Sequence, residues 1–552
     1  MYSDKENINI LTALLLAHGV RHAVVCPGSR NAPITHNLCE AREMTCVSVT
    51  DERSAAFVAL GKAQALGEPV VVCVTSGSAL VNTLPAVVEA WYQHVPIIVV
   101  SADRPAAMIG QLQGQTMPQQ KTLEAFWAKE VSLPEPHDDV ERWYCNRLAN
   151  EALCAMKHSG GGPVHINVPI SEPLFNFTTA ELPTERRVSL MDNHLWPSEL
   201  TEEFLVSSRP MLVVGQLQCT VARRVSGAIR RLEESVVVLS EQLASCGNAP
   251  CHFDEALIGI GEQEAYKPDY IIYIGDTLVS KRAKHFLQHC HPKSCVVVNA
   301  SGKLTDVTMN VTDVVVCPVE DALDSLCEKL ESGDVALGNE ASAFRGRWAM
   351  ALDKWAIRCK VFEPAYSQMM AVRRLCEQTN GQECHMQFAN SSAVRLGQLY
   401  SSHHLYVNRG VNGIEGSLST AVGFASEKDV MVYCVIGDLS FFYDQNALWN
   451  GVGKRHLRMV VLNNGGGGIF HQLRGLEQSP YRDSFVSATH TASAKGVCEA
   501  TGVAYKAAGN EEELAEGISW ITRGQATGPL LLEVFTNAEI DAREYKKYLE
   551  TK

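Results

Sequence analysis

Short runs of apolar and β-branched residues recur along the whole chain, with segments long enough for a helix between them. In the first third of the sequence these runs are HAVVCPG, TCVSVTDE, PVVVCVTSG, VPIIVVSADRP and GPVHINVP. Continuous apolar runs of this length are typical of strands that are buried on both faces of a parallel sheet. The alternation of such strands with helices predicts an α/β fold.

The same pattern returns in two further blocks. The second contains PMLVVGQL, SVVVLS, DYIIYIGD, SCVVVNAS and DVVVCP, and the third contains HLYVNRG, VMVYCVIGD, LRMVVLNN and PLLLEVF. The pattern fades near residue 185 and again near Leu337 to Glu340. A chain of 552 residues has room for about three or four domains. We therefore expect three successive α/β domains, each with a central, mostly parallel sheet, over residues 1–185, 186–345 and 346–552.

Charge and cysteine usage narrow the range of functions. The chain carries 48 Lys and Arg against 62 Asp and Glu, a formal net charge of −14. This balance argues against general binding of nucleic acid or anionic membranes, because both need a basic surface. The polar N-terminus MYSDKENINI is no signal peptide, and no apolar run approaches the ~18 residues of a membrane span. The 18 cysteines are scattered without a CxxC pair, which predicts a reducing cytoplasm.

Two loops of the third block predict a cation site. Ligands of open α/β sheets bind beyond the carboxyl ends of the strands. Asp438 and Asn464 each follow a strand, and their spacing suits two neighbouring parallel strands joined by one helix. A carboxylate, an amide oxygen and a carbonyl of the run GGGG would form an oxygen site for Mg²⁺ or Ca²⁺ that holds a diphosphate. The glycine run alone is also compatible with a plain flexible loop.

The combination of GD and NN at this spacing resembles the signature of the thiamin-diphosphate-dependent enzymes, in which GDG precedes NN. Leu439 stands where that signature has its second glycine. The resemblance implies a glutamate that contacts the aminopyrimidine ring and activates the cofactor. Glu52, after the run TCVSVT, is the candidate. Considered alone, Glu52 would be interpreted as an N-terminal helix cap or a partner of the helix dipole.

Cationic side chains are concentrated in loops that follow predicted strands. Any one of them could be a surface residue, but together, in an acidic chain, they indicate a polyanionic substrate. The planar guanidinium of arginine suits carboxylates, which it binds through two hydrogen bonds. These residues are Arg30, Arg104, Lys281, Arg282, Arg395 and Arg409.

Seven segments together resemble the MenD family, the 2-succinyl-5-enolpyruvyl-6-hydroxy-3-cyclohexene-1-carboxylate synthases of menaquinone biosynthesis. That family carries GDLS in place of GDG, so Leu439 agrees with it. The resemblance runs through all three predicted domains and implies the order pyrimidine-binding, central and diphosphate-binding. It also implies a homodimer or a dimer of dimers, with the cofactor between the first domain of one subunit and the third of another. The segments are CPGSRNAPIT, TDERSAAF, VTSGSALVN, SADRP, NRGVNGIEGSLSTA, GDLSFFYDQNAL and NNGGGGIF.

The resemblance implies a carboligase that uses thiamin diphosphate with Mg²⁺ or Mn²⁺. The enzyme would decarboxylate 2-oxoglutarate and add the succinyl carbanion equivalent to isochorismate in a conjugate addition. Glu52 would activate the cofactor, and Ile414 would be the apolar prop that bends it. The metal ligands would be Asp438, Asn464 and the carbonyl of Gly466.

The resemblance also assigns the substrate contacts. Ser391 and Arg395 would hold the distal carboxylate of 2-oxoglutarate. Ser29 and Gln115 would be polar partners near the reacting atoms, and Phe470 would supply an apolar wall. The residues that would receive the carboxylates and the developing charge of isochorismate are Arg30, Arg104, Lys281, Arg282 and Arg409.

Three alternatives stay open at this point. A non-catalytic relative that only binds the cofactor is one, and the presence of Glu52, Asp438 and Asn464 argues against it. An enzyme of the acetolactate synthase type, or a simple 2-oxo-acid decarboxylase, would use the same cofactor machinery, although a pyruvate-using enzyme needs no second carboxylate contact. A nucleotide-binding oxidoreductase with Rossmann domains is the third. Against it, no GxGxxG follows a predicted strand with an acidic residue about twenty positions further on.

Overall fold

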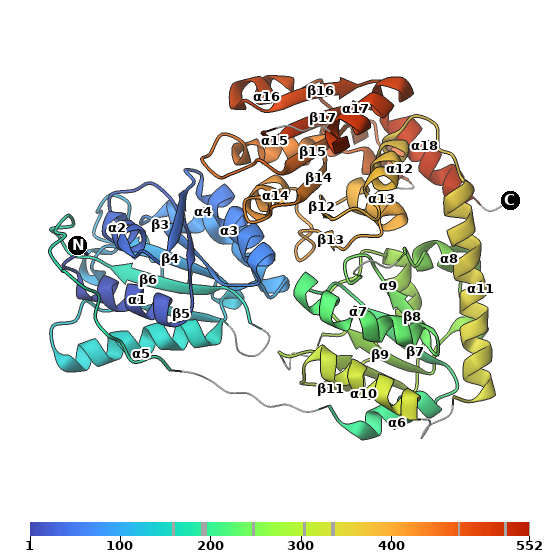
Figure 1. The fold of residues 1–552 in the computed structure, drawn as a ribbon, viewed down its shortest axis with the longest axis horizontal. Helices are drawn as coiled ribbons and strands as arrows, with labels where there is room; N and C mark the ends of the chain where they lie inside the picture. Colours follow the sequence, from blue (N-terminus) through green and yellow to red (C-terminus); the bar gives the residue numbers. More distant parts are fainter. Residues whose placement is uncertain are drawn as a thin grey trace. The chain divides into compact units, whose positions relative to one another are not determined.

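The computed structural model describes residues 1–156, 161–188, 196–245, 249–301, 305–332, 337–472, 475–523 and 527–550. Internal contacts divide the chain into two compact units. Unit 1 comprises Met1–Asp192, Gly410–Asp429 and Tyr443–Leu457; unit 2 comprises Asn193–Arg409, Val430–Phe442 and Arg458–Lys552. The described strands form one sheet in unit 1 and two in unit 2 (Figure 1).

The sheet of unit 1 has six strands in the order β2-β1-β3-β4-β6-β5, all paired in parallel. Helices α1 and α5 pack together against one face, where apolar side chains of both helices meet those of the strands. The strands are β1 (His22–Val25), β2 (Thr45–Ser48), β3 (Val70–Val74), β4 (Ile97–Asp103), β5 (Lys129–Ser132) and β6 (Val164–Pro169). The helices are α1 (Glu6–Ala17), α2 (Ala32–Glu40), α3 (Glu52–Leu66), α4 (Ser78–Tyr92) and α5 (Asp139–Ala155).

The second sheet has five strands in the order β11-β10-β9-β7-β8, again paired in parallel. Its strands are β7 (Pro210–Val214), β8 (Val237–Ser240), β9 (Tyr270–Ile274), β10 (Ser294–Val298) and β11 (Asp313–Val315). The accompanying helices are α6 (Ser198–Val206), α7 (Cys219–Glu233), α8 (Phe253–Ile260), α9 (Lys281–Gln288) and α10 (Val319–Ser332). The long helix α11 (Asn339–Val361) leads to the third sheet.

The third sheet has six strands in the order β13-β12-β14-β15-β17-β16. They are β12 (Cys384–Phe388), β13 (Leu405–Tyr406), β14 (Met431–Gly437), β15 (Leu457–Asn463), β16 (Ala504–Ala508) and β17 (Leu530–Phe535). The helices are α12 (Gln368–Thr379), α13 (Ser392–Tyr400), α14 (Ser417–Ala425), α15 (Asp438–Tyr443), α16 (Lys495–Thr501), α17 (Glu511–Arg523) and α18 (Ala538–Leu549). Short helical turns are η1 (Ala106–Met108), η2 (Glu124–Phe126), η3 (Glu264–Tyr266), η4 (Gln445–Ala447), η5 (Gly468–Gln472), η6 (Leu476–Gln478) and η7 (Arg482–Val486).

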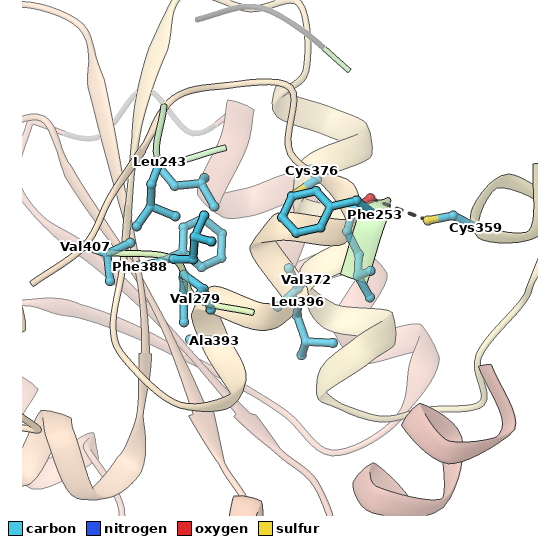
Figure 2. Close-up of a cluster of buried hydrophobic side chains, with 14 of the residues drawn as sticks. Leu243, Phe253, Val279, Cys359, Val372, Cys376, Phe388, Ala393, Leu396 and Val407 are labelled. Atoms are coloured by element: carbon cyan, nitrogen blue, oxygen red, sulfur yellow. Dashed lines mark hydrogen bonds between the residues drawn. The ribbon is translucent and has the colours of Figure 1, made fainter. Parts of the chain in front are cut away.

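One continuous core joins the second and third sheets. Figure 2 shows side chains of the second-sheet region, Leu243, Phe253 and Val279, among side chains of the third-sheet region such as Phe388 and Leu396. All of these side chains are buried. Burial of this shared apolar surface stabilises the two sheets as one body, which explains why both belong to unit 2.

Close helix packing explains why the segment Gly410–Asp429 belongs to unit 1, although the residues before and after it in the sequence belong to unit 2. Helix α14 lies directly against α3, and glycines make the contact possible. A Cβ at Gly61 would lie 2.0 Å from the carbonyl oxygen of Thr420, and one at Gly423 would lie 2.1 Å from that of Val58. The two backbones therefore approach more closely than any side chain would allow.

The structure confirms the predicted fold class, three α/β regions built on parallel sheets. Every strand segment named from the sequence forms a strand, while β5, β12 and β16 were not predicted. The domain boundaries at residues 185 and 345 remain predictions, and α11 continues across the second of them. Within the described residues, none of the helices combines the length and apolarity that a membrane crossing needs.

Candidate active site

Four loops with predicted site residues leave neighbouring strands of the third sheet. Strands β13, β12, β14 and β15 are adjacent in that order. The residues that follow them are Arg409, Ser391, Asp438 and Asn464, respectively. The prediction that the strands before Asp438 and Asn464 are neighbours is confirmed. This edge of the sheet is the position at which α/β folds bind ligands.

Asp438 is held by the backbone of the glycine loop. Its Oδ2 accepts hydrogen bonds from the amides of Gly465 and Gly466, at 2.9 and 3.0 Å, and its Oδ1 accepts one from Leu439 at 2.7 Å. The side chain is buried, and Nε2 of His490 lies 3.4 Å from Oδ2. Burial raises the pKa of Asp438, while the backbone hydrogen bonds and His490 act in the opposite direction. A cation at this carboxylate would likewise favour its charged form.

The glycine loop has a conformation that only glycine accommodates easily. Gly465 and Gly466 have φ values of +77° and +154°, and a Cβ at Gly466 would lie 2.7 Å from the carbonyl oxygen of Ser487. Asn464 donates from Nδ2 to Asp541 at 3.1 Å, so its amide oxygen is the atom with which it would bind a cation. Carboxylate, amide and carbonyl oxygens are the donors that Mg²⁺ and Mn²⁺ prefer, so the residues present fit such an ion.

Asn390, the residue before Ser391, links its loop to that of Arg409 by hydrogen bonds. Asn390 donates to the carbonyl of Asn408 at 2.6 Å and accepts from Nη1 of Arg409 at 3.1 Å. Ser391 has a φ of +73°, a region that serine rarely adopts, and it immediately precedes α13. Arg395, one turn into α13, has a buried Nε with no hydrogen-bond acceptor among the described residues. Strained backbone and an unsatisfied guanidinium are features of a binding site.

Lys281 and Arg282 begin helix α9 beyond the carboxyl end of β9 and line a pocket of about 410 Å³. Arg282 pairs with Asp254 of α8. Arg395 lines a different pocket, shared with Glu241, Asp254 and Gln398. Within unit 2, Arg395 therefore lies in a different pocket from Lys281 and Arg282. Asp254 lines the pocket of Arg395 and pairs with Arg282.

In unit 1 the structure separates the roles of Asp51 and Glu52. Asp51 caps helix α3, because its Oδ1 accepts a hydrogen bond from the amide of Ser54 at 3.0 Å. Glu52 is the first residue of the helix and is half-buried; its Oε2 accepts a hydrogen bond from Asn82 at 3.2 Å. Glu52 is close enough to Cys26 to add to the effect of burial, which raises the pKa of that thiol. The capping role considered for Glu52 therefore belongs to its neighbour.

Arg30 and Arg104 follow β1 and β4 and share one anionic partner. Arg30 is buried, and its Nη2 lies 3.1 Å from Oε1 of Glu172. Nη1 of Arg104 lies 3.8 Å from the same oxygen. Ser29 and Gln115 are exposed, and Gln115 has a φ of +55° with its backbone beside Gly77. The loops after β1, β3 and β4 thus gather these four residues in unit 1.

The two apolar candidates differ in their surroundings. Ile414 has 46% of its surface exposed. Phe470 is half-buried, and its ring lies where a side chain at Gly467 would be, because a Cβ there would be 2.7 Å from the ring. Phe470 is therefore fixed against the same glycine loop that holds Asp438.

Buried polar residues that the sequence did not single out hold these loops. Glu89 on α4 accepts hydrogen bonds from the amides of Gly410 and Val411, at 2.8 and 3.0 Å. Glu241 and Asn390 hold other loops in unit 2 in a similar way. Neither residue type nor spacing marks them out, because their partners lie elsewhere in the sequence.

Comparison with known proteins agrees with this geometry. Residues 8–124 match the family described as "Thiamine pyrophosphate enzyme, N-terminal TPP binding domain", and residues 389–534 match its "C-terminal TPP binding domain". The two matches cover the loops of Glu52 and of Asp438 and Asn464.

Proteins described as 2-succinyl-5-enolpyruvyl-6-hydroxy-3-cyclohexene-1-carboxylate synthase match the chain over its whole length. The one from Bacteroides thetaiotaomicron is 42% identical over 99% of both chains, and that from Phocaeicola vulgatus is 41% identical over 100% of both. The protein of Desulfotalea psychrophila is 35% identical over 97% of this chain and 98% of its own. Such identity across entire chains establishes more than a shared fold, and the chain belongs to the family of 2-succinyl-5-enolpyruvyl-6-hydroxy-3-cyclohexene-1-carboxylate synthases.

Proposed function

We propose that the protein decarboxylates 2-oxoglutarate and adds the resulting four-carbon unit to isochorismate by conjugate addition, in menaquinone biosynthesis. The observation that carries the proposal is the row of loops at the edge of the third sheet. It sets a fixed carboxylate and glycine loop beside a strained serine and an arginine whose Nε is buried. The first pair suits a cofactor diphosphate, and the second suits the far carboxylate of a dicarboxylic donor.

The proposed cofactor is thiamin diphosphate with one Mg²⁺ or Mn²⁺. Asp438, Asn464 and the carbonyl of Gly466 would hold the ion, because all three offer oxygen donors on adjacent loops. The amides of Gly465 and Gly466 donate hydrogen bonds to Asp438. Backbone amides of glycine-rich loops also bind phosphate oxygens. When bound, thiamin diphosphate supplies an electron sink for the electrons left by the departing carbon dioxide.

Glu52 would exchange a proton with the aminopyrimidine ring of the cofactor. Its position at the first turn of α3 is fixed by the cap that Asp51 provides, which leaves the Glu52 carboxylate available for this contact. Ile414 would support the cofactor from an apolar side, and Phe470 would line the space above the glycine loop. Both side chains exclude water from the reacting atoms, which strengthens the polar contacts there.

Ser391 and Arg395 would bind the distal carboxylate of 2-oxoglutarate. Ser29 and Gln115 would be polar partners close to the reacting carbon atoms. The acceptor, isochorismate, carries carboxylates and develops further negative charge during the addition, which cationic side chains stabilise. The residues proposed for it are Arg30, Arg104, Lys281, Arg282 and Arg409.

The resemblance to the thiamin-diphosphate-dependent enzymes implies an assembly of at least two chains. We propose a homodimer or a dimer of dimers, in which one subunit contributes Glu52 and another contributes Asp438. We also propose a cytoplasmic location, since the 18 cysteines are scattered without CxxC pairs.

A donor assay tests the reaction. Carbon dioxide release is measured with 2-oxoglutarate or pyruvate, each with and without isochorismate, in the presence of thiamin diphosphate and Mg²⁺. We expect release from 2-oxoglutarate and transfer of the four-carbon unit to isochorismate. Equal use of pyruvate would instead favour an enzyme of the acetolactate synthase type.

A further inference from the structure

We propose that Glu241 is a positioning residue for the acceptor substrate, which holds the start of helix α9 so that Lys281 and Arg282 present their charges correctly. The inference rests on the proposed function of those two cations. Glu241 follows β8, at the carboxyl edge of the second sheet, and 4% of its surface is exposed. A buried carboxylate needs strong partners, because water no longer solvates its charge.

The partners of Glu241 are backbone amides that immediately precede the two cations. Its Oε1 accepts from Val279 and Ser280, both at 2.9 Å, and its Oε2 accepts from Val279 at 2.7 Å. One carboxylate thus fixes two consecutive peptide units. Ser280 then caps α9, accepting from the amide of Ala283 at 2.9 Å. The direction in which α9 starts, and with it the position of Lys281, depends on these contacts.

The same turn is held from its other side. Asp254, at the start of α8, accepts a hydrogen bond from Oγ of Ser280 and pairs with Arg282. Val279 is packed by its side chain into the core that joins the second and third sheets (Figure 2). The turn is therefore tied by its backbone, by a hydroxyl and by an apolar side chain, and Glu241 supplies the backbone contacts.

Glu241 also offsets a local excess of positive charge. Burial lowers the pKa of Lys284, and Arg409 and Lys281 lower it further, while Glu241 acts in the opposite direction. Arg409 in turn counteracts the burial that raises the pKa of Glu241 to about 7. Like charges in a partly buried space repel strongly unless an anion lies among them. In its ionised form Glu241 reduces this repulsion at Lys284 and Arg409.

The test is the substitution Glu241→Gln, which keeps the size of the side chain. An amide nitrogen in place of Oε2 would face the amide of Val279 with two donors and no acceptor, and the negative charge would be lost. We expect the KM for isochorismate to rise by roughly 10- to 100-fold, the range of a lost hydrogen bond to a charged group. The KM for 2-oxoglutarate should rise by a smaller factor, because Glu241 also lines the pocket of Arg395 but its hydrogen bonds go to Val279 and Ser280.

Glu255→Gln is the matched control. Glu255 is a buried glutamate that lines the same pocket as Glu241, and burial raises its pKa to about 8. Its carboxylate lies 3.8 Å from Nδ1 of His252, and glutamine keeps the size of the side chain. We expect the KM for isochorismate to change by less than about twofold in this variant. A rise equal to that of Glu241→Gln would mean that any change in this pocket has the effect, and the proposal would be wrong.

Lys281→Ala distinguishes failure of the inference from failure of the proposed function. If Lys281→Ala raises the KM for isochorismate and Glu241→Gln does not, Glu241 is not a positioning residue. If neither does, the assignment of Lys281 to the acceptor is wrong as well. In the double variant we expect less than the product of the two single effects, because both act through one contact. Thermal unfolding of the full-length protein with cofactor must give similar midpoints for both glutamine variants, and a selective loss of folding in Glu241→Gln would assign this residue to stability instead.

Discussion

Asp438 and Glu52 are carboxylates proposed to act on the same cofactor, yet their surroundings differ. Asp438 in unit 2 is buried and accepts hydrogen bonds from the amides of Leu439, Gly465 and Gly466. Glu52 in unit 1 is half-buried, at the first turn of a helix, and accepts from the side chain of Asn82. One carboxylate is fixed by the main chain, and the other is restrained by a side-chain amide.

The difference matches the two tasks. A carboxylate that binds a cation needs a constant position, and rigid backbone donors provide it. A carboxylate that exchanges a proton needs a partner that tolerates both protonation states. Substitutions at the two positions should therefore fail in different ways, the first in binding and the second in rate.

The largest effect is expected for Asp438→Ala. Removing one partner of a buried charge pair costs roughly 3–5 kcal/mol, which corresponds to about a 10²–10⁴-fold loss of affinity. Calorimetric titration with thiamin diphosphate and Mg²⁺ measures this loss, and activity should be abolished at ordinary cofactor concentrations. Asp429→Ala, which alters an exposed aspartate shortly before β14, is the control. Near-normal affinity in Asp438→Ala would rule out a metal ligand at this position.

Glu52→Gln should slow the reaction without loss of the cofactor. Glutamine can still form a hydrogen bond but cannot accept the proton, and general acid–base contributions are about 10²–10⁴-fold in rate. Hydrogen–deuterium exchange at the thiazolium carbon reports this step directly. Glu68→Gln, at an exposed residue just beyond the end of the same helix, should exchange at the wild-type rate. If Glu52→Gln also did, the contrast between the two carboxylates would disappear.

The substitution Arg395→Ala tests whether a residue of unit 2 determines the preference for 2-oxoglutarate over pyruvate as the donor. With pyruvate, the guanidinium of Arg395, whose Nε is buried, would be unpaired. An unpaired buried charge costs roughly 3–5 kcal/mol, or about two to four powers of ten in kcat/KM. The substitution should therefore impair the 2-oxoglutarate reaction and leave the poor pyruvate reaction almost unchanged. The comparison variant is Arg374→Ala. Arg374 lies on helix α12, is half-exposed and pairs with Glu377 of that helix. Equal losses with both donors would argue against a carboxylate contact.

The smallest effect, and the sharpest control on the comparison, is expected for Glu89→Gln in unit 1. Glu89 holds backbone amides as Asp438 does, but these amides belong to Gly410 and Val411 and not to the glycine loop. The loss should be one of stability, about 1–3 kcal/mol. Burial raises the pKa of Glu89, so the folded protein retains a proton that the unfolded chain releases above about pH 4.3. The contribution of this group to stability is therefore full at lower pH and declines as the pH rises through the folded-state pKa.

Unfolding by urea at pH 5 and pH 8 measures this dependence. The difference in the free energy of unfolding between the wild type and Glu89→Gln should be smaller at pH 8 than at pH 5. A difference that stays constant, or grows with pH, would show that Glu89 does not retain the proton.

The strands that the sequence failed to predict have a common physical cause. Strands β5 and β16 lie at the edges of their sheets, where one side of the strand has no neighbour, and their sequences KEVS and AYKAA lack a continuous apolar run. Strand β12 is internal, but CHMQF mixes polar residues with apolar ones. Strands that are buried on both faces can be predicted from their apolar composition, whereas strands with polar positions cannot.

The succession of apolar strands, loops and helices along the sequence was sufficient to predict the fold class and much of the proposed cofactor site. Asp438 and Asn464 each follow an apolar strand, and a residue that ends a parallel strand lies at a known edge of the sheet whatever the rest of the chain does. Sequence alone could not decide whether Asp51 or Glu52 caps α3, because both acids stand at the same helix start. It also could not identify Glu89, Asn390 or Glu241 as the residues that hold the loops. Their hydrogen-bond partners are separated from them along the chain, by as many as 321 residues for Glu89 and Gly410, and only the packing of the folded protein brings a buried carboxylate and its backbone donors together.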